Sequence, residues 1–442
     1  MKIRRITAVF MAACLCVLLT GCKMFSVDTE QLMTPPELTG EMVPISRALS
    51  SSIKGEYQLK YPSSGERRSA IILEDIDGDG AVEAFAFYST QDDETTNMHI
   101  NAVCKGKSGY KSVAEQSIVA GNVEMVDFCD LDGDGIKEII VGWEVYGASE
   151  KRLCVYSLDR KKLSRRLSEK YTGFACCDLT GSGSFELFIH LLDTSSMINS
   201  ASLYRFSDGG LQKIGGCILD SEVKTASSPV FSRLSSGRPA VYIDEIKGAG
   251  AVTEVLVFGD DELKNPLLET DDTIENIRTL RSASIPCMDI DFDGVPEIPV
   301  ATNLPNAADT EELLYYTNWC EFDGENLLTK KITVFNTIDG YYLDVPQNLE
   351  GHLAVLKDTD NHRRVFYYYD AQSDIIGERL ASIEVISEKK WQSKSFDRRN
   401  LFELGEDKSV VFVGSVNLTG AVQISQKQLK ELFNLIPQEV QK

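Results

Sequence analysis

Three short acidic segments hold the residues whose types and spacing could do chemistry. Each has aspartates at positions 1, 3 and 5, a glycine at position 6 and a glutamate at position 9. The segments run from 75 to 83, from 130 to 138 and from 289 to 297. Alternate carboxylates that curl around a glycine turn can surround one hard cation, and calcium takes six to eight oxygen ligands of this kind. The pattern therefore predicts three calcium sites.

A backbone carbonyl at position 7 can complete each set of ligands. The predicted ligands are Asp75, Asp77, Asp79, the Ala81 carbonyl and Glu83; Asp130, Asp132, Asp134, the Ile136 carbonyl and Glu138; and Asp289, Asp291, Asp293, the Val295 carbonyl and Glu297. Four carboxylates in one turn repel each other, and a bound divalent ion would offset that repulsion and stabilise the folded state. The alternative interpretation is three acidic turns that hold no ion.

Two further segments repeat the pattern without its full set of acids. The segment 178–186 has hydroxyl residues at positions 3 and 5 and keeps only Asp178 and Glu186, so we expect it to bind a cation poorly. The segment 232–240 keeps Gly237 but has none of the acids, and we expect it to be empty.

The acidic segments belong to a longer repeat that must position them. Similar segments begin at residues 75, 130, 178, 232, 289 and about 358, and periods of roughly 50 residues indicate repeated supersecondary units. Short stretches rich in Val, Ile, Tyr and Phe follow each segment, and polar hairpin tips such as Asp208-Gly209 separate them. Each period is typical of four antiparallel strands, the blade of a β-propeller.

We therefore predict an all-β fold, a β-propeller of about seven four-stranded blades, with six or eight as alternatives. Strands from 401–404 and 410–413 would form the seventh unit, and an outer strand from 53–61 would close the ring and protect the last sheet edge. A short C-terminal helix is expected over 425–436, where apolar residues share one helical face. A pair of stacked β-sandwiches is the alternative architecture.

The first residues predict export from the cytoplasm. Basic residues precede an apolar run from Ile6 to Leu19, which at about fourteen residues is too short to span a bilayer. The run ends in Leu-Thr-Gly-Cys, which resembles the bacterial lipobox and implies cleavage before Cys22 and attachment of lipid to it; an ordinary signal peptide is the alternative. The predicted domains are a lipoprotein signal peptide over 1–21, a lipid-anchored tether over 22–52, a β-propeller over 53–424 and a C-terminal helix and tail over 425–442.

Composition excludes some classes of function. The chain has 442 residues, with 45 Lys and Arg against 67 Asp and Glu, and a formal net charge of -22. This acidity argues against nucleic acid as a partner, because phosphate binding needs clustered basic residues. No catalytic residues are predicted, since the sequence has no G-x-S-x-G and no recognisable triad motif around its four histidines. The cysteines after Cys22 could form disulfides, but their place in apolar strands favours free thiols.

The acidic segments, the strands that follow them and their period resemble the VCBS and FG-GAP repeat family, which includes the propeller of integrin α-chains. An EF-hand is excluded because its glutamate lies at position 12 and its loop lies between helices. The resemblance covers about residues 65–300 well and 300–415 weakly, and implies calcium-binding loops between the first two strands of some blades. The Phe-Gly and Gly-Ala-Pro signatures are absent, so no integrin-like ligand site is implied.

These observations predict a lipid-anchored, calcium-binding propeller on the extracytoplasmic face of a bacterial membrane. We expect a non-enzymatic binding or scaffold module at the cell surface, with a protein or carbohydrate as its ligand. Two alternatives stay open. The first is a propeller enzyme that acts on polysaccharide, a hydrolase or lyase, and the second is a subunit of an envelope or sensor complex.

Overall fold

The computed structural model describes most of the chain. The described residues are 40–90, 97–145, 147, 150–159, 162–268, 274–281, 285–304, 315–358 and 362–436. The predicted signal peptide, Cys22 and the first part of the predicted tether lie outside these residues, as does the tail after 436. Within the described part of the chain, no helix is both long enough and apolar enough to cross a membrane.

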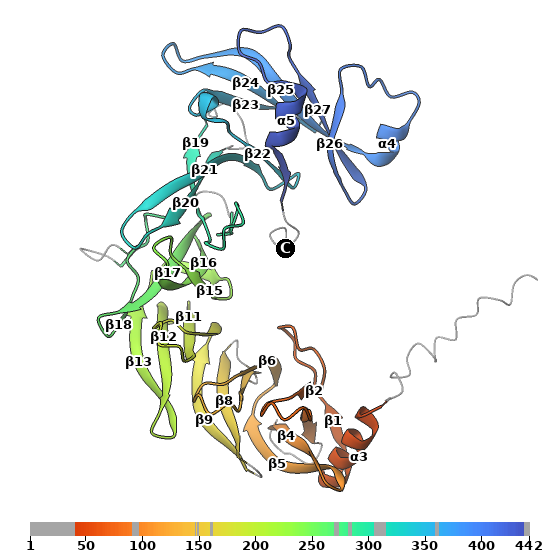
Figure 1. The fold of residues 1–442 in the computed structure, drawn as a ribbon, viewed down its shortest axis with the longest axis vertical. Helices are drawn as coiled ribbons and strands as arrows, with labels where there is room; N and C mark the ends of the chain where they lie inside the picture. The colour runs from red at the N-terminus through yellow and green to blue at the C-terminus, as the bar shows by residue number, and fades with distance from the viewer. Residues whose placement is uncertain are drawn as a thin grey trace, which may run out of the picture.

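The described residues form six antiparallel sheets that follow one another along the chain (Figure 1). The first sheet contains β1 (Tyr57–Leu59), β2 (Ile71–Glu74), β3 (Glu83–Thr90), β4 (Asn97–Gly106) and β5 (Gly109–Val119). The second contains β6 (Asn122–Cys129), β7 (Glu138–Glu144), β8 (Lys151–Asp159) and β9 (Lys162–Tyr171). The third contains β10 (Gly173–Cys177), β11 (Glu186–Asp193), β12 (Ile198–Ser207) and β13 (Gly210–Ile218).

The other three sheets have five strands each, as the first sheet does. The fourth contains β14 (Val223–Ala226), β15 (Val230–Arg233), β16 (Pro239–Lys247), β17 (Gly250–Gly259) and β18 (Glu262–Lys264). The fifth contains β19 (Ile298–Asn303), β20 (Tyr315–Phe322), β21 (Leu327–Asn336), β22 (Tyr341–Asp344) and β28 (Phe433–Leu435). The sixth contains β23 (Leu353–Asp358), β24 (Arg363–Asp370), β25 (Ile375–Ser387), β26 (Phe402–Asp407) and β27 (Val410–Val416). The prediction of an all-β chain of repeated antiparallel units is confirmed.

Neighbouring sheets pack face to face through alternate residues of the same strands. In β7, Ile139, Val141 and Trp143 are buried against the first sheet, whereas Ile140 is buried against the third. Successive side chains of a strand point to opposite faces, so a strand that is covered on both faces is apolar almost throughout. This explains why uninterrupted apolar runs follow the acidic segments.

Hairpin tips follow the turn chemistry expected from the sequence. Asp208 and Gly209 form the two-residue turn between β12 and β13, where Ser207 pairs with Gly210. Both turn residues have positive φ, at 51° and 77°. Two successive residues with positive φ are typical of the type I′ turn, whose twist matches that of the flanking strands. The local sequence thus sets the pairing of this hairpin.

The six sheets lie along an open arc and not in a ring that a seventh unit closes (Figure 1). The strands expected in that unit are β26 and β27, and β27 pairs with β25 of the sixth sheet. The outer strand expected to close the ring is β1, which instead pairs with β3 of the first sheet. Among the described residues, no strand pair joins the first sheet to the sixth.

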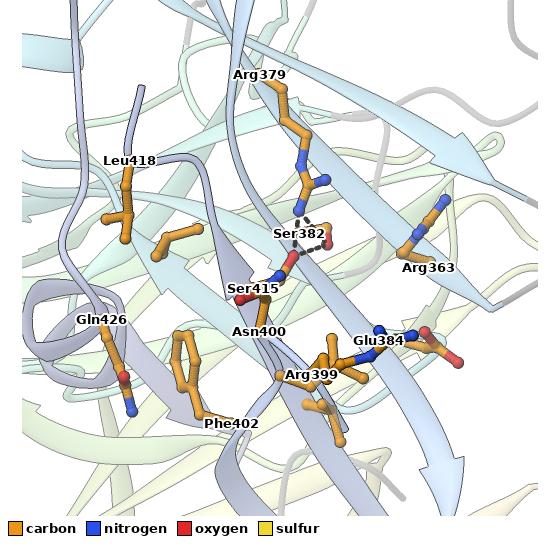
Figure 2. A pocket seen from close by; sticks show the side chains of 13 residues that line it. Arg363, Arg379, Ser382, Glu384, Arg399, Asn400, Phe402, Ser415, Leu418 and Gln426 are labelled. Carbon is orange, nitrogen blue, oxygen red and sulfur yellow. Dashed lines mark hydrogen bonds between the residues drawn. The ribbon is translucent and has the colours of Figure 1, made fainter. Parts of the chain in front are cut away.

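Short helical segments cover the outward faces at the two ends of the arc. Helix α3 (Met42–Ser52) buries Ile45 and Leu49 completely against the first sheet. At the other end, Trp391 of α4 (Glu388–Gln392) packs on β25 and β27, and the rest of this face borders a cavity with polar walls (Figure 2). Terminal units of stacked repeats need such caps to avoid exposed apolar faces. The helix α3 is therefore part of the folded body, although the sequence placed it in the tether.

The end of the described chain returns to the fifth sheet. Ser425 caps α5 (Gln426–Leu432), and its hydroxyl accepts a hydrogen bond from the Gln428 N–H at 3.2 Å. The chain then continues as β28, which pairs with β22. The predicted helix over 425–436 is therefore shorter than expected, because its last residues extend into a strand that links the fifth sheet to the segment after the sixth.

The cysteines lie among apolar side chains of the sheets. The structure has free thiols at Cys104, Cys129, Cys154, Cys176, Cys177, Cys217, Cys287 and Cys320. Cys129, which directly precedes the second acidic loop, and Cys177, which precedes the incomplete segment 178–186, are buried in the clusters between sheets. Small buried thiols of this kind behave as core residues.

Candidate metal centres

Three loops place carboxylates at the same position in three different sheets. They join β2 to β3 and β6 to β7, and the third leads into β19. In each loop, side-chain oxygens of the first aspartate, the second aspartate and the glutamate lie within 4.8 Å of one another. The three sets are Asp75, Asp77 and Glu83; Asp130, Asp132 and Glu138; and Asp289, Asp291 and Glu297. The structure therefore brings three of the five predicted ligands of each loop together in a cluster that could hold a metal ion. The third aspartates, Asp79 and Asp134, are not part of these sets, and Asp293 belongs to a separate set with Glu297.

Backbone amides hold these carboxylates in place. In the first loop, the Gly80 N–H donates to Asp75 Oδ2 at 3.0 Å, and the Ile76 N–H donates to Glu83 Oε2 at 3.2 Å. The corresponding bonds measure 3.0 and 2.9 Å in the second loop and 2.8 and 2.9 Å in the third. The first and last carboxylates thus have the same orientation in all three loops.

The aspartate at position 5 accepts a hydrogen bond from the backbone N–H at position 7. The acceptors are Asp79, Asp134 and Asp293, and the donors are Ala81, Ile136 and Val295, at 2.7, 2.7 and 2.8 Å. This bond fixes the peptide unit that directly precedes the carbonyl predicted as a ligand. Coordination by the three carbonyls stays a prediction.

The loops turn through left-handed backbone at positions 4 and 6. Gly78 and Gly80 have φ of 70° and 84°, which glycine adopts without a steric penalty. The third loop has Phe292 at position 4, with φ of 64° and a side chain that is 85% exposed. This conformation costs a non-glycine residue about 1 kcal/mol or more. The third loop therefore keeps the shape of the other two in spite of a less favourable residue.

Burial makes the closing glutamates resist ionisation. Glu138 is only 3% exposed and Glu297 is fully buried. Burial, together with the negative charge of the neighbouring aspartates, raises the pKa of both carboxyls to about 7. Burial likewise raises the pKa of Glu83. A cation in each cluster would favour the ionised form instead, because opposite charge stabilises a carboxylate.

The segment 178–186, which lies between β10 and β11, has only part of the acidic pattern, and an arginine supplies the positive charge beside its glutamate. Glu186 is fully buried, and Arg205 of β12 donates to its Oε1 through Nε at 3.2 Å and Nη2 at 2.8 Å. Nη2 also donates to Thr180 Oγ1 at 2.8 Å. The Gly183 N–H donates to Asp178 Oδ2 at 2.8 Å, as in the complete loops. This copy keeps the loop shape but neutralises its glutamate with a side chain of the protein.

In the third acidic loop, the neighbouring strand adds another acid. Oxygens of Glu321 on β20, Asp293 and Glu297 lie within 4.8 Å of one another, and Glu321 is only 5% exposed. Lys330 Nζ binds Glu321 Oε1 at 2.7 Å. The Oε1 of Glu297 is buried and has no hydrogen-bond partner among the described residues. This loop therefore gathers one more carboxylate than the others around an unsatisfied oxygen.

Sequence reasoning missed the residues that face the closing glutamates from the next strand. They are Arg205 and Glu321, together with Ser157, whose hydroxyl donates to Glu138 Oε1 at 3.0 Å. The one available signal was a polar residue within an apolar strand, as in Leu203-Tyr204-Arg205-Phe206. That signal alone does not say which loop the side chain meets.

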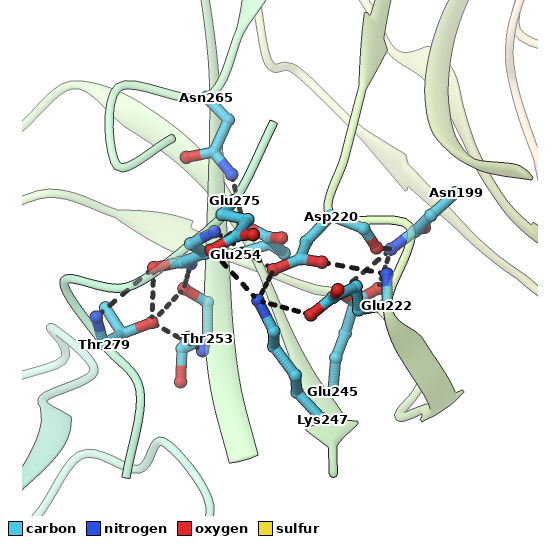
Figure 3. Close-up of polar contacts among 11 residues, drawn as sticks. Asn199, Asp220, Glu222, Glu245, Lys247, Thr253, Glu254, Asn265, Glu275 and Thr279 are labelled. Atoms are coloured by element: carbon cyan, nitrogen blue, oxygen red, sulfur yellow. Dashed lines mark hydrogen bonds and ion pairs between the residues drawn. The ribbon is translucent and has the colours of Figure 1, made fainter. Parts of the chain in front are cut away.

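A second polar cluster is buried between the third and fourth sheets (Figure 3). Lys247 donates to Asp220 Oδ2 at 2.8 Å, and Asn199 donates to both carboxylate oxygens of Glu245 at 3.0 Å. Burial, followed by repulsion from Glu245, raises the pKa of Glu254 to about 8. The protein thus supplies a lysine and side-chain amides to these acids, although the Oε1 of Glu254 is buried and has no hydrogen-bond partner among the described residues.

Comparisons with known proteins identify no family. No family model matches the chain, and no curated protein matches it. Similar solved structures include a rhamnogalacturonan lyase of Bacillus licheniformis, at 10% identity over 71% of this chain and 89% of that one, with a TM-score of 0.30. Another is the periplasmic gluconolactonase of Pseudomonas aeruginosa, at 14% identity over 74% and 88%, with a TM-score of 0.29. Likenesses this weak say nothing about activity. The class that the fold and the loops define is an all-β repeat protein whose carboxylate clusters could hold metal ions.

Proposed function

We propose that this protein is a calcium-binding module, built from sheets that resemble β-propeller blades, that binds or scaffolds other molecules without catalysis. The observation that carries the proposal is the same carboxylate geometry in three sheets. Exposed acidic turns are common without an ion, but here the closing glutamates are buried and the amide bonds recur. Calcium fits an all-oxygen set of protein ligands better than magnesium, which retains more water.

The ion has a structural role in this proposal. Each loop leads into a strand of its sheet that begins at or next to the closing glutamate. A cation would compensate the buried carboxylates and fix the start of that strand. Because it would bind the folded chain and not the unfolded one, it would raise the stability by mass action.

We further propose that Cys22 is lipidated and holds the protein on the extracytoplasmic face of a bacterial membrane. The support is the order of basic residues, apolar run and Leu-Thr-Gly-Cys in the first 22 residues. Incorporation of labelled palmitate by the native chain, and its loss in Cys22→Ser, is the expected result. Equal labelling of both chains would contradict this anchor.

The metal proposal is tested on the mature chain after treatment with EDTA. We expect calorimetric titration to detect calcium binding, and calcium to raise the melting temperature. Asp130→Asn combined with Glu138→Gln should remove one bound ion per chain, because it disables one loop. Asp208→Asn at an exposed hairpin tip is the matched control. The proposal fails if the purified protein contains no calcium and its melting temperature is the same in EDTA and in calcium.

A further inference from the structure

A cavity of about 580 Å³ opens on the outer face of the sixth sheet, which has none of the three acidic loops (Figure 2). One wall is the sheet, with Arg363 on β24, Arg379 and Ser382 on β25, and Ser415 on β27. The facing wall is the segment that precedes and begins β26. Cavities that bind small molecules typically measure roughly 300–1,000 Å³, so this one has a suitable size.

Arg379 contributes a guanidinium with neutral partners. Its Nη2 donates to the Ser382 hydroxyl at 3.3 Å and to the Ser415 hydroxyl, and Figure 2 shows the side chain directed at these two serines. Its Nε is buried and has no hydrogen-bond partner within the described part of the chain. No carboxylate among the described residues forms an ion pair with it. Arg379 as a whole is only half-buried, but neutral partners are notable for a guanidinium in a chain with a large excess of acids.

A second guanidinium lies near the first. Arg363 pairs with Asp358 through Nη2 at 2.5 Å, but its Nε is also buried without a hydrogen-bond partner in the described residues. Burial lowers the pKa of Arg379, and repulsion by Arg363 lowers it further. The acid in the same wall, Glu384, is held by Lys390 at 3.3 Å. An anion between the two arginines would therefore relieve their repulsion.

We propose that this cavity binds the oxyanionic group of a small organic ligand, with Arg379 and Arg363 as its main donors. Guanidinium groups match carboxylates and phosphates with paired N–H donors. The hydroxyls of Ser382 and Ser415 orient Arg379 for this role. Phe402 on the facing wall offers an apolar surface to the uncharged part of the ligand.

This site is separate from the proposed metal centres. Its side chains come from the sixth sheet and the segments around it, whereas the acidic loops belong to the first, second and fifth sheets. EDTA should therefore leave oxyanion binding unchanged in a chain that stays folded. Failure of one proposal does not affect the other.

The test is calorimetric titration of the mature chain with glucuronate, succinate and inorganic phosphate, and with glucose as the neutral control. Binding of glucuronate or succinate identifies a carboxylate ligand, and preferential binding of phosphate identifies a phosphorylated one. We expect Arg379→Gln to weaken binding at least about tenfold, and Arg379→Lys to weaken it less, since lysine keeps the charge but loses the paired donors. Arg47→Gln, on the exposed side of α3, should leave it unchanged.

Two further measurements keep the result unambiguous. Melting curves and circular dichroism show whether each variant is folded, and Arg363→Gln replaces Arg379→Gln if the latter unfolds. Equal binding by the native chain and by both arginine variants would overturn the proposal. The same holds if none of the three anions binds the native chain at millimolar concentration.

Discussion

Replacing Arg205 should reveal how much the fold depends on a built-in positive charge. In the loop between β10 and β11, its guanidinium is the cation that contacts the buried carboxylate of Glu186. We expect Arg205→Met, a change that keeps most of the apolar stem, to lower the free energy of unfolding by about 2–3 kcal/mol in EDTA.

This magnitude follows from the burial of the two partners. Removing one member of a buried ion pair costs roughly 3–5 kcal/mol, because it leaves an uncompensated charge inside the protein. Glu186 is fully buried, but the Arg205 side chain is 40% exposed, so solvent screens part of the interaction. The Thr180 hydroxyl would still donate to Glu186 Oε1 at 2.7 Å. The expected loss therefore falls below that range.

The assay is urea unfolding followed by far-ultraviolet circular dichroism, with EDTA present so that bound cations do not contribute. Glu186→Gln removes the charge that Arg205 neutralises. The double variant, with both changes, should therefore be more stable than the sum of the two single losses predicts, by about 1 kcal/mol or more. Arg165→Met, at an exposed position of β9, is the matched control and should change the stability by less than about 0.5 kcal/mol.

Two results would refute this reasoning. One is a loss below about 0.5 kcal/mol in Arg205→Met, the size expected of an ordinary surface substitution. The other is strict additivity in the double variant, which would show that the two side chains do not interact energetically.

Further outcomes are expected at other sites. In EDTA, stability should fall as the pH rises from about 5 to about 8, because Glu138 and Glu297 bind protons more tightly in the folded chain, with pKa values near 7, than in the unfolded chain. Calcium should raise the melting temperature most at the upper end of that range, and an equal increase at every pH would contradict this. Leu49→Ala should cost about 2–4 kcal/mol in urea unfolding, since α3 buries it fully against the first sheet. Gly142→Ala should lower the melting temperature, because its Cβ would collide with the Tyr171 hydroxyl, and Tyr171→Phe in the same chain should restore part of the loss.

Features that depend on near neighbours could be predicted from the sequence. The segment 75–83 contains its own carboxylates and its own glycines, so its spacing already indicated which oxygens would meet. The turn at Asp208 and Gly209 likewise follows from the φ angles that these two residues tolerate. The period of the repeat indicated separate antiparallel units, because each unit pairs strands that follow each other in the chain.

Features that depend on strand register could not be predicted. Arg205 reaches Glu186 because Leu187 pairs with Tyr204 on the adjacent strands. A shift of one residue would turn the arginine to the opposite face of the sheet. The sequence analysis assigned the strand at 410–413 to a seventh unit, whereas β27 pairs with β25 of the sixth sheet. The reason is similar, since an apolar strand can pair with more than one neighbour.

The sequence by itself determined the acidic loops, the strand-rich repeat and the chemistry that the loops offer. These properties depend only on the types and spacing of a few adjacent residues. Only the tertiary structure decided how the charge of each loop is balanced. Arg205 neutralises Glu186, whereas Glu321 adds another carboxylate beside Glu297 in a cluster that could hold a metal ion. It also decided that the arc stays open and capped by α3. The physical reason is that the energy of a buried charge, or of an apolar face, depends on what distant segments bring against it.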